Sequence, residues 1–309
     1  MQPIKLGTRG SRLALWQARY TADSIQLACP TARVETVIIK TRGDKILDTA
    51  LSRIGGKGLF TSEIESELLD GKIDLAVHSL KDLPSQLSAG LCLAAYLKRE
   101  DYRDVLLSSQ GYKLASLPPG AVLGTSSLRR IAQLKSARPD LKTVDLRGNV
   151  ETRIHKMQEL GLDGIILACA GVKRLGFEGY ITDYLSSDII LPAVGQGIIA
   201  VETREDDSSI REILNQINDA EAHWQANAER AFLKQLQGGC QVPIGALATV
   251  QDDDIILDGL VSSLDGKTII RGQEKGSLNK AASIGVILAK RLLDQGADTI
   301  LAEIERLGE

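Results

Sequence analysis

The sequence predicts an α/β fold of two similar lobes with a cleft between them, followed by a small C-terminal α+β domain with a three-stranded antiparallel sheet. Through the first two hundred residues, short apolar runs alternate with segments of helical period, which is typical of parallel sheets covered by helices. The stretch LGTRGSRL at 6–13 is echoed by LGTSSLRR at 123–130, which indicates two related lobes. After residue 243 the apolar residues alternate with polar ones, as in exposed antiparallel strands.

Periodicity and turn residues place the elements of the two lobes. Strands are expected at 34–40, 73–78, 121–124, 142–145 and 164–168, and helices at 61–69 and 150–160. Ser62 and Glu65 have the spacing of a capping box, and Gly71 and Gly161 are placed to end the two helices.

The segment LPAVGQG at 191–197 has the proline and glycine content of a connection that returns the chain to the first lobe. A polar helix at 221–237 is followed by expected strands at 244–250, 254–263 and 267–276, a hairpin turn at 264–267, and a final helix at 279–293. We therefore expect a first lobe of residues 1–98 and 198–216, a second lobe of residues 99–197, and a third domain of residues 217–309.

Composition narrows the class of function. The chain has 309 residues and a net charge of -3, so it has no overall field that would attract nucleic acid or an anionic membrane. Its longest apolar runs, such as 164–172, are too short to cross a bilayer, and residues 1–8 lead directly into a strand without a signal segment. The four cysteines form no CxxC pair and the three histidines are scattered. We expect a cytoplasmic protein without disulfides, without a metal and with a small-molecule ligand.

Basic and hydroxyl residues follow the predicted strands. They are Arg9, Ser11, Thr125, Ser126, Ser127, Arg129, Arg130, Arg147, Arg153, Lys173 and Arg174, with Lys57 in a GGKG loop at 55–58. Ligands of open α/β sheets bind at the carboxyl ends of strands, and arginine grips a carboxylate with two bonds. Any one of these arginines is equally well explained as solvated surface charge. Gathered in both lobes, they indicate a ligand with several carboxylates or phosphates.

The stretch VHSLKDLP at 77–84 follows a buried strand and ends in a turn, so its polar side chains are expected to face the same cleft. Asp82 is the best acid/base candidate, with Ser79 and Lys81 beside it. Taken alone, a structural aspartate in a turn explains Asp82 better.

The stretch GGCQVPIG at 238–245 places Cys240 behind two glycines and before a proline, on a tight turn that presents the thiol outward. The alternative is a small apolar plug near the end of a helix. Cys29, Cys92 and Cys169 each lie in or beside an apolar run and are expected to be structural.

The order of the motifs resembles the hydroxymethylbilane synthase (porphobilinogen deaminase) family of tetrapyrrole biosynthesis. The matching stretches are GTRGSRLALWQA (7–18), KTRGDKILD (40–48), GGKGLFTSEIE (55–65), DLAVHSLKDLP (74–84), LGTSSLRR (123–130), LRGNVETR (146–153), AGVKRLG (170–176), LPAVGQG (191–197) and GGCQVPIG (238–245). They cover most of the chain in the family's order, and no position that the family uses for chemistry departs from the pattern.

The resemblance implies a monomeric transferase that joins four porphobilinogen molecules head to tail into hydroxymethylbilane and releases ammonia each time. It implies a dipyrromethane cofactor bound to Cys240 through a thioether, with its carboxylates held by Ser79, Lys81, Thr125, Ser127, Arg129 and Arg130. It assigns the incoming substrate to Lys57, Arg9, Ser11, Arg147 and Arg153, later elongation steps to Arg174, and catalysis to Asp82. The loop at 45–58, rich in glycine and charge, is a candidate lid.

Two rival interpretations come from other classes of protein. A non-enzymatic anion receptor fits the two lobes and cleft, which resemble periplasmic-type binding proteins, but it leaves the third domain and its cysteine without a role. A cysteine-nucleophile hydrolase needs a histidine partner for the thiol, and none of His78, His155 and His223 lies in a recognisable pattern with Cys240.

Overall fold

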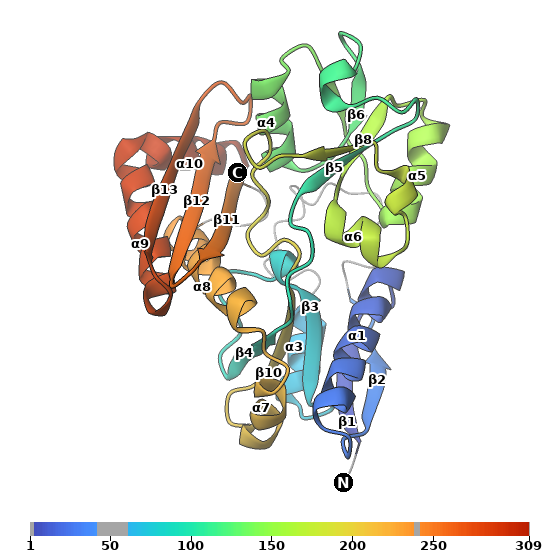
Figure 1. Cartoon of the computed structure of the whole chain (residues 1–309), viewed down its shortest axis with the longest axis vertical. Helices are drawn as coiled ribbons and strands as arrows, with labels where there is room; N and C mark the ends of the chain where they lie inside the picture. The colour runs from blue at the N-terminus through green and yellow to red at the C-terminus, as the bar shows by residue number, and fades with distance from the viewer. Residues whose placement is uncertain (1–2, 42–60, 238–241, 309) are drawn as a thin grey trace.

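The computed structural model describes residues 3–41, 61–237 and 242–308, which form two five-stranded sheets and one three-stranded sheet (Figure 1). The candidate lid at 45–58, with Lys57, and Cys240, the expected attachment point of the cofactor, lie outside the described residues. The predicted α/β architecture with a separate antiparallel C-terminal sheet is confirmed.

The first lobe is a sheet with the strand order β2-β1-β3-β10-β4, packed against helices. Its strands are β1 (Ile4–Thr8), β2 (Val34–Ile38), β3 (Leu75–Ser79), β4 (Leu91–Tyr96) and β10 (Ile199–Arg204), and its helices are α1 (Arg12–Ala28), α3 (Ser62–Leu69) and α7 (Ser208–Asn215). Leu6, Leu75 and Ile199 from three neighbouring strands are fully buried against Ala18 and Ile25 of α1. This continuous apolar layer holds the end of β1 and the start of α1 in fixed positions at the sheet edge.

The second lobe repeats this arrangement with the order β7-β6-β8-β5-β9. Its strands are β5 (Asp104–Ser108), β6 (Val122–Gly124), β7 (Lys142–Val144), β8 (Gly164–Ala168) and β9 (Asp183–Leu185), and its helices are α4 (Leu128–Ala137), α5 (Val150–Glu159) and α6 (Cys169–Arg174). In each lobe, the strand before the echoed motif lies between two parallel neighbours. The internal echo in the sequence therefore corresponds to a real topological repeat.

The two sheets are mixed, because each lobe contains one antiparallel strand among parallel ones. β10 runs antiparallel to β3 and β4, and β5 runs antiparallel to β8 and β9. Each of these strands is the one that the chain enters directly from the other lobe. It starts at the edge where its neighbour ends, with Ile199 opposite Ser79 and Asp104 opposite Ala168. A strand that starts at the carboxyl edge of a parallel sheet must run backwards.

The C-terminal domain packs helices on the antiparallel sheet β11-β12-β13. Its strands are β11 (Ile244–Gln251), β12 (Asp254–Ser262) and β13 (Ile269–Ser277), and its helices are α8 (Ala220–Gln235), α9 (Ala281–Leu292) and α10 (Asp298–Gly308). Gly285 of α9 lies so close to the carbonyl oxygen of Ala228 in α8 that a Cβ there would collide with it. The sequence predicted a single final helix, whereas Gly296, with φ of 104°, separates α9 from α10.

The capping box expected at Ser62 and Glu65 does not form. Thr61 is the N-cap of α3, so Ser62 is already the first helical residue, and no side chain caps the helix. The Glu65 carboxylate instead accepts a hydrogen bond from the Ser88 hydroxyl, 23 residues away along the chain. Gly71 and Gly161 end their helices as predicted, with φ of 67° and 61°.

Candidate functional site

The carboxyl ends of β1 and β3 border a cavity of about 70 Å³ in the first lobe. Its lining includes Arg9, Ser11, Gln17, Ser79 and Asp82. Four of these residues were predicted from the sequence to belong to one site, and the parallel pairing of β1 with β3 is what brings them together. Gln17, on the first turns of α1, was not predicted.

Local hydrogen bonds orient the two hydroxyls of this cavity. Ser11 is the N-cap of α1, and its Oγ accepts a hydrogen bond from the backbone N–H of Ala14 at 3.3 Å. Ser79 Oγ accepts a hydrogen bond from Gln17 Nε2 at 2.8 Å. Each hydroxyl keeps its proton to donate, so both can act as donors to an anionic ligand. Asp82 ends the short helix Leu80–Asp82 and is exposed.

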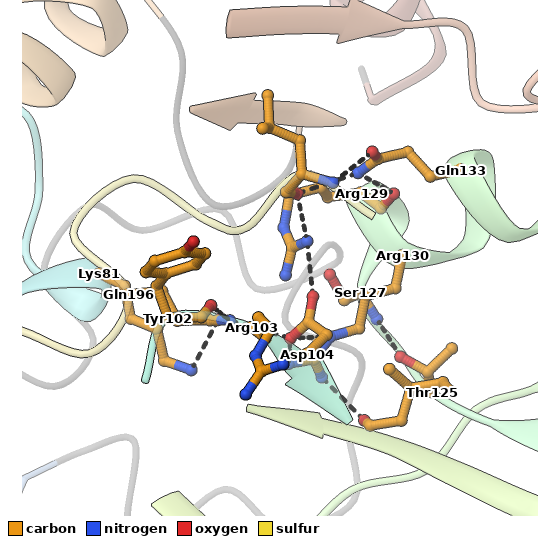
Figure 2. Close-up of polar contacts among 12 residues, drawn as sticks. Lys81, Tyr102, Arg103, Asp104, Thr125, Ser127, Arg129, Arg130, Gln133 and Gln196 are labelled. Atoms are coloured by element: carbon orange, nitrogen blue, oxygen red, sulfur yellow. Dashed lines mark hydrogen bonds and ion pairs between the residues drawn. The ribbon is translucent and has the colours of Figure 1, made fainter. Parts of the chain in front are cut away.

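A buried ion cluster lies at the corresponding edge of the second lobe (Figure 2). Arg129 and Arg130, on the first turn of α4, both pair with Asp104, the first residue of β5, at 2.8 and 2.7 Å. The arginines are each 6% exposed and Asp104 is fully buried. Burial alone would raise the pKa of the Asp104 carboxyl, but the two guanidinium groups hold it well below its usual range. Two cations and one anion leave the cluster with a net positive charge.

Lys81 of the first lobe extends toward this cluster through Gln196 (Figure 2). Lys81 Nζ lies 3.5 Å from Gln196 Oε1, and Gln196 Nε2 donates to Asp104 Oδ1 at 3.0 Å. Burial lowers the pKa of the Lys81 ammonium to about 8, against a raising effect of Asp82 and a further lowering by Arg130. Cations from the two lobes therefore lie close enough for the charge of Arg130 to lower the pKa of Lys81.

Three more predicted arginines come from the second lobe. Burial lowers the pKa of Arg153 to about 10, and the charges of Arg130, Asp82 and Arg147 also act on it. Burial likewise lowers the pKa of Arg174 to about 10. Arg174 Nη2 donates to the Gly197 carbonyl oxygen at 2.7 Å, and its guanidinium lies 5.6 Å from the ring centroid of Trp16 in α1. Arg174 thus contacts both the return connection and the first lobe.

The remaining predicted residues lie as follows. Thr125 is buried, and its Oγ1 accepts a hydrogen bond from the backbone N–H of Ser127, the N-cap of α4, at 3.3 Å. Cys169 is buried and Cys29 and Cys92 are half-buried, none of them in a disulfide.

Sequence reasoning missed Asp104 and Gln196, which hold the cluster together. Asp104 belongs to the charged stretch REDYRD at 99–104, which reads as a solvated connection between lobes. Gln196 lies in the LPAVGQG motif, where its amide had no assigned partner. The only signal for Asp104 in the sequence was its position directly before an apolar run. In the structure that run is a strand, and the strand begins at the sheet edge where the arginines lie.

The lowered pKa of Lys81 leads to a prediction about pH. Without a bound ligand, the stability of the wild-type protein relative to Lys81→Met should rise by about 1–3 kcal/mol between pH 8 and 10.5. In that window the folded protein binds fewer protons than the unfolded chain, so unfolding is increasingly disfavoured as pH rises. Below pH 8, Lys81 is charged in both states and its burial penalty is fully present. Urea unfolding of both proteins at both ends of the window measures this, and equal pH dependences would contradict it.

In the described ranges, no three His, Cys, Asp or Glu side chains are grouped closely enough to hold a metal ion. No described helix combines the length and apolar character needed to span a bilayer.

The fold and site define a class of protein: a two-lobed α/β protein with a third domain, whose sheet edges carry several cations, an arrangement suited to an anionic ligand. The chain matches two family descriptions, "Porphobilinogen deaminase, dipyromethane cofactor binding domain" over residues 4–212 and "Porphobilinogen deaminase, C-terminal domain" over residues 224–294. The chain belongs to the porphobilinogen deaminase family, as its motifs predicted.

Relatives of similar length support this membership. The porphobilinogen deaminase of Syntrophomonas wolfei is 58% identical over 306 residues, which cover 99% of this chain and all of the relative. That of Carboxydothermus hydrogenoformans is 52% identical over 98% of this chain and 97% of its own length.

Among solved structures, immunogenic lipoprotein A from Vibrio vulnificus matches with a TM-score of 0.44 and 13% identity, over 71% of this chain and 96% of its own. A double mutant of the VFT2 domain of Bordetella pertussis BvgS matches with a TM-score of 0.41 and 16% identity, over 69% of this chain and 85% of its own.

Proposed function

We propose that this chain joins four porphobilinogen molecules head to tail into hydroxymethylbilane, with release of ammonia, for tetrapyrrole biosynthesis. The observation that carries the proposal is the convergence of Lys81 from the first lobe with Arg129 and Arg130 from the second. They meet through Gln196 and Asp104, within the segment that matches the family's cofactor-binding domain. The enzyme class is a transferase with a covalent dipyrromethane cofactor, and Cys240 is its attachment point through a thioether.

The residues present fit that cofactor. A dipyrromethane carries acetate and propionate groups and is polyanionic, while the cluster of Asp104, Arg129 and Arg130 is cationic and buried. Buried arginines favour carboxylates because each guanidinium can donate two parallel hydrogen bonds. We assign the cofactor carboxylates to Ser79, Lys81, Thr125, Ser127, Arg129 and Arg130.

The incoming substrate is assigned to residues at the first-lobe cavity and to second-lobe arginines near it. Arg9 and Ser11 border the same cavity as Asp82. Arg153 lies close enough to Asp82 for the negative charge of that carboxylate to raise the pKa of the guanidinium. Arg147 and Lys57 complete the substrate set, and Arg174, which contacts the first lobe and the return connection, serves later elongation steps.

Asp82 is the catalytic residue in this assignment. When bound, the cofactor supplies the nucleophilic pyrrole carbon that begins the chain. The Asp82 carboxylate borders the substrate cavity, where it can stabilise positive charge near a pyrrole nitrogen and accept the proton lost when the new bond forms. We further propose that the protein acts as a monomer in the cytoplasm, without a metal.

The intact mass of the purified protein tests the proposal. We expect a mass excess equal to two porphobilinogens less two ammonias, located by peptide mapping on Cys240 and absent from the peptides of Cys29, Cys92 and Cys169. Protein purified without the adduct should acquire it on incubation with porphobilinogen and release ammonia. A bare Cys240 after that incubation would refute the proposal and would favour an anion receptor.

A further inference from the structure

Asp104 lies between two buried second-lobe cations, Arg129 and Arg130, and is joined through Gln196 to Lys81 of the first lobe. Its Oδ2 accepts a hydrogen bond from Arg129 Nη1 at 2.8 Å, and its Oδ1 accepts hydrogen bonds from Arg130 Nη2 at 2.7 Å and Nε at 3.2 Å. The carboxylate is fully buried, so these bonds are not screened by water. One side chain on β5 thus holds both arginines of α4 (Figure 2).

Gln196 extends this arrangement to the first lobe. Its Nε2 donates to Asp104 Oδ1 at 3.0 Å and to the Tyr102 carbonyl oxygen at 2.7 Å. These bonds turn the Gln196 carbonyl oxygen toward Lys81 Nζ, 3.5 Å away. Asp104 therefore influences the orientation of a first-lobe cation as well as two second-lobe cations.

The hydrogen bonds made by the two arginines leave one donor edge of Arg129 available to a ligand. Arg130 uses its Nε and Nη2 edge on Asp104 and its Nη1 on the Ile166 carbonyl oxygen at 2.9 Å. Within the described ranges, Arg129 is bonded only through Nη1, to Asp104 and to the Leu191 carbonyl oxygen. Its Nε and Nη2 edge, which has the geometry for two parallel bonds to a carboxylate, is left for a ligand.

We propose that Asp104 is a positioning residue for the cofactor site, which orients Arg129 and Arg130 directly and Lys81 through Gln196. The inference rests on the proposed function, because it takes the cofactor carboxylates as the ligand of these cations. Asp104 itself touches no ligand in this arrangement. Its negative charge also lets two guanidinium groups lie side by side in the protein interior, where they would otherwise repel each other.

Asp104→Asn tests this role, because asparagine keeps the shape of the side chain and removes its charge. The amide would also place a donor against guanidinium donors, so the arginines should rotate away. We expect the fraction of purified protein that carries the two-pyrrole adduct, read from the intact mass, to fall about tenfold or more. In the molecules that are loaded, the KM for porphobilinogen should stay within about twofold of the wild-type value, since substrate is assigned to other residues.

Glu229→Gln is the matched control. Glu229 is also fully buried and pairs with an arginine, Arg99, but it contacts none of the cations assigned to the cofactor. We expect this variant to lose stability and to keep its adduct. An equal loss of adduct in both variants would overturn the positioning role, as would an Asp104→Asn protein that is fully loaded.

Gln196→Leu keeps the inference testable if Asp104→Asn does not fold. It leaves both ion pairs of Asp104 in place and removes the amide that joins Asp104 and the Tyr102 carbonyl to Lys81. Loading should therefore fall about threefold, and unchanged loading would count against the proposal. The wild-type mass separates the two proposals. A wild-type protein that never acquires pyrrole refutes both, whereas a loaded wild type with normally loaded variants refutes only the role of Asp104.

Discussion

Asp82→Asn is expected to lower the rate of hydroxymethylbilane formation by about 10²–10³-fold while leaving the protein folded and loaded with its cofactor. Asp82 is exposed at the end of a short helix, so its carboxylate makes little contribution to the core. It borders the cavity that also contains Arg9, Ser11 and Ser79. Asparagine fits the same space but carries no charge to stabilise a cationic pyrrole and cannot accept its proton.

The measurement is ammonia release at saturating porphobilinogen, with the intact mass confirming that the adduct is present. Asp70→Asn is the matched control, because Asp70 is also an exposed aspartate at the end of a helix and pairs only with Lys72 among the described residues. We expect that control to retain wild-type turnover. An Asp82→Asn enzyme with near-wild-type turnover would show that the catalytic carboxylate lies elsewhere.

Glu229→Gln is expected to cause the largest loss of stability, about 3 kcal/mol in the free energy of unfolding. Glu229 of α8 is fully buried and pairs with Arg99 at 2.6 Å. Its two oxygens also accept hydrogen bonds from the backbone N–H groups of Gly195 at 2.6 Å and Ala248 at 2.8 Å. One carboxylate thereby joins the third domain to both connections between the lobes.

A glutamine side chain can accept only some of the hydrogen bonds that the Glu229 carboxylate accepts. Its amide nitrogen would face a donor, and the charge of Arg99 would remain buried without a counter-ion. Urea unfolding followed by circular dichroism measures the change, with Glu303→Gln on the exposed face of α10 as control. That control should stay within about 0.5 kcal/mol of wild type. A Glu229→Gln protein of equal stability would mean that the junction is held mainly by its apolar contacts.

Elements with strong local signals were predictable. The strand expected at 164–168 is β8, and the helix expected at 150–160 is α5, which ends at the predicted glycine. Both depend on periodicity and turn residues within about ten positions, so neighbouring residues carry all the information. The capping box failed because α3 begins after Thr61 rather than after Ser62, and Glu65 instead pairs with Ser88, a contact that no local pattern reveals.

The candidate site also has one part that the sequence predicted and another part that it did not. Family motifs and strand-end positions assigned Asp82, Lys81 and the arginines, and the structure brings most of them to facing sheet edges. The direction of β5 and β10 was not predictable, because it depends on where the chain crosses between lobes rather than on the composition of either strand.

By itself, the sequence determined the fold class, the repeated lobes and the family, and it supplied the set of cations that we propose to hold a polyanion. Only the tertiary structure decided how those cations are held, because Asp104 and Gln196 are 92 residues apart and meet where the two connections between the lobes run side by side. The sequence shows which side chains are charged and with what sign. Which groups they pair with depends on how the chain packs, because a buried carboxylate is stable only where the folded chain surrounds it with hydrogen-bond donors.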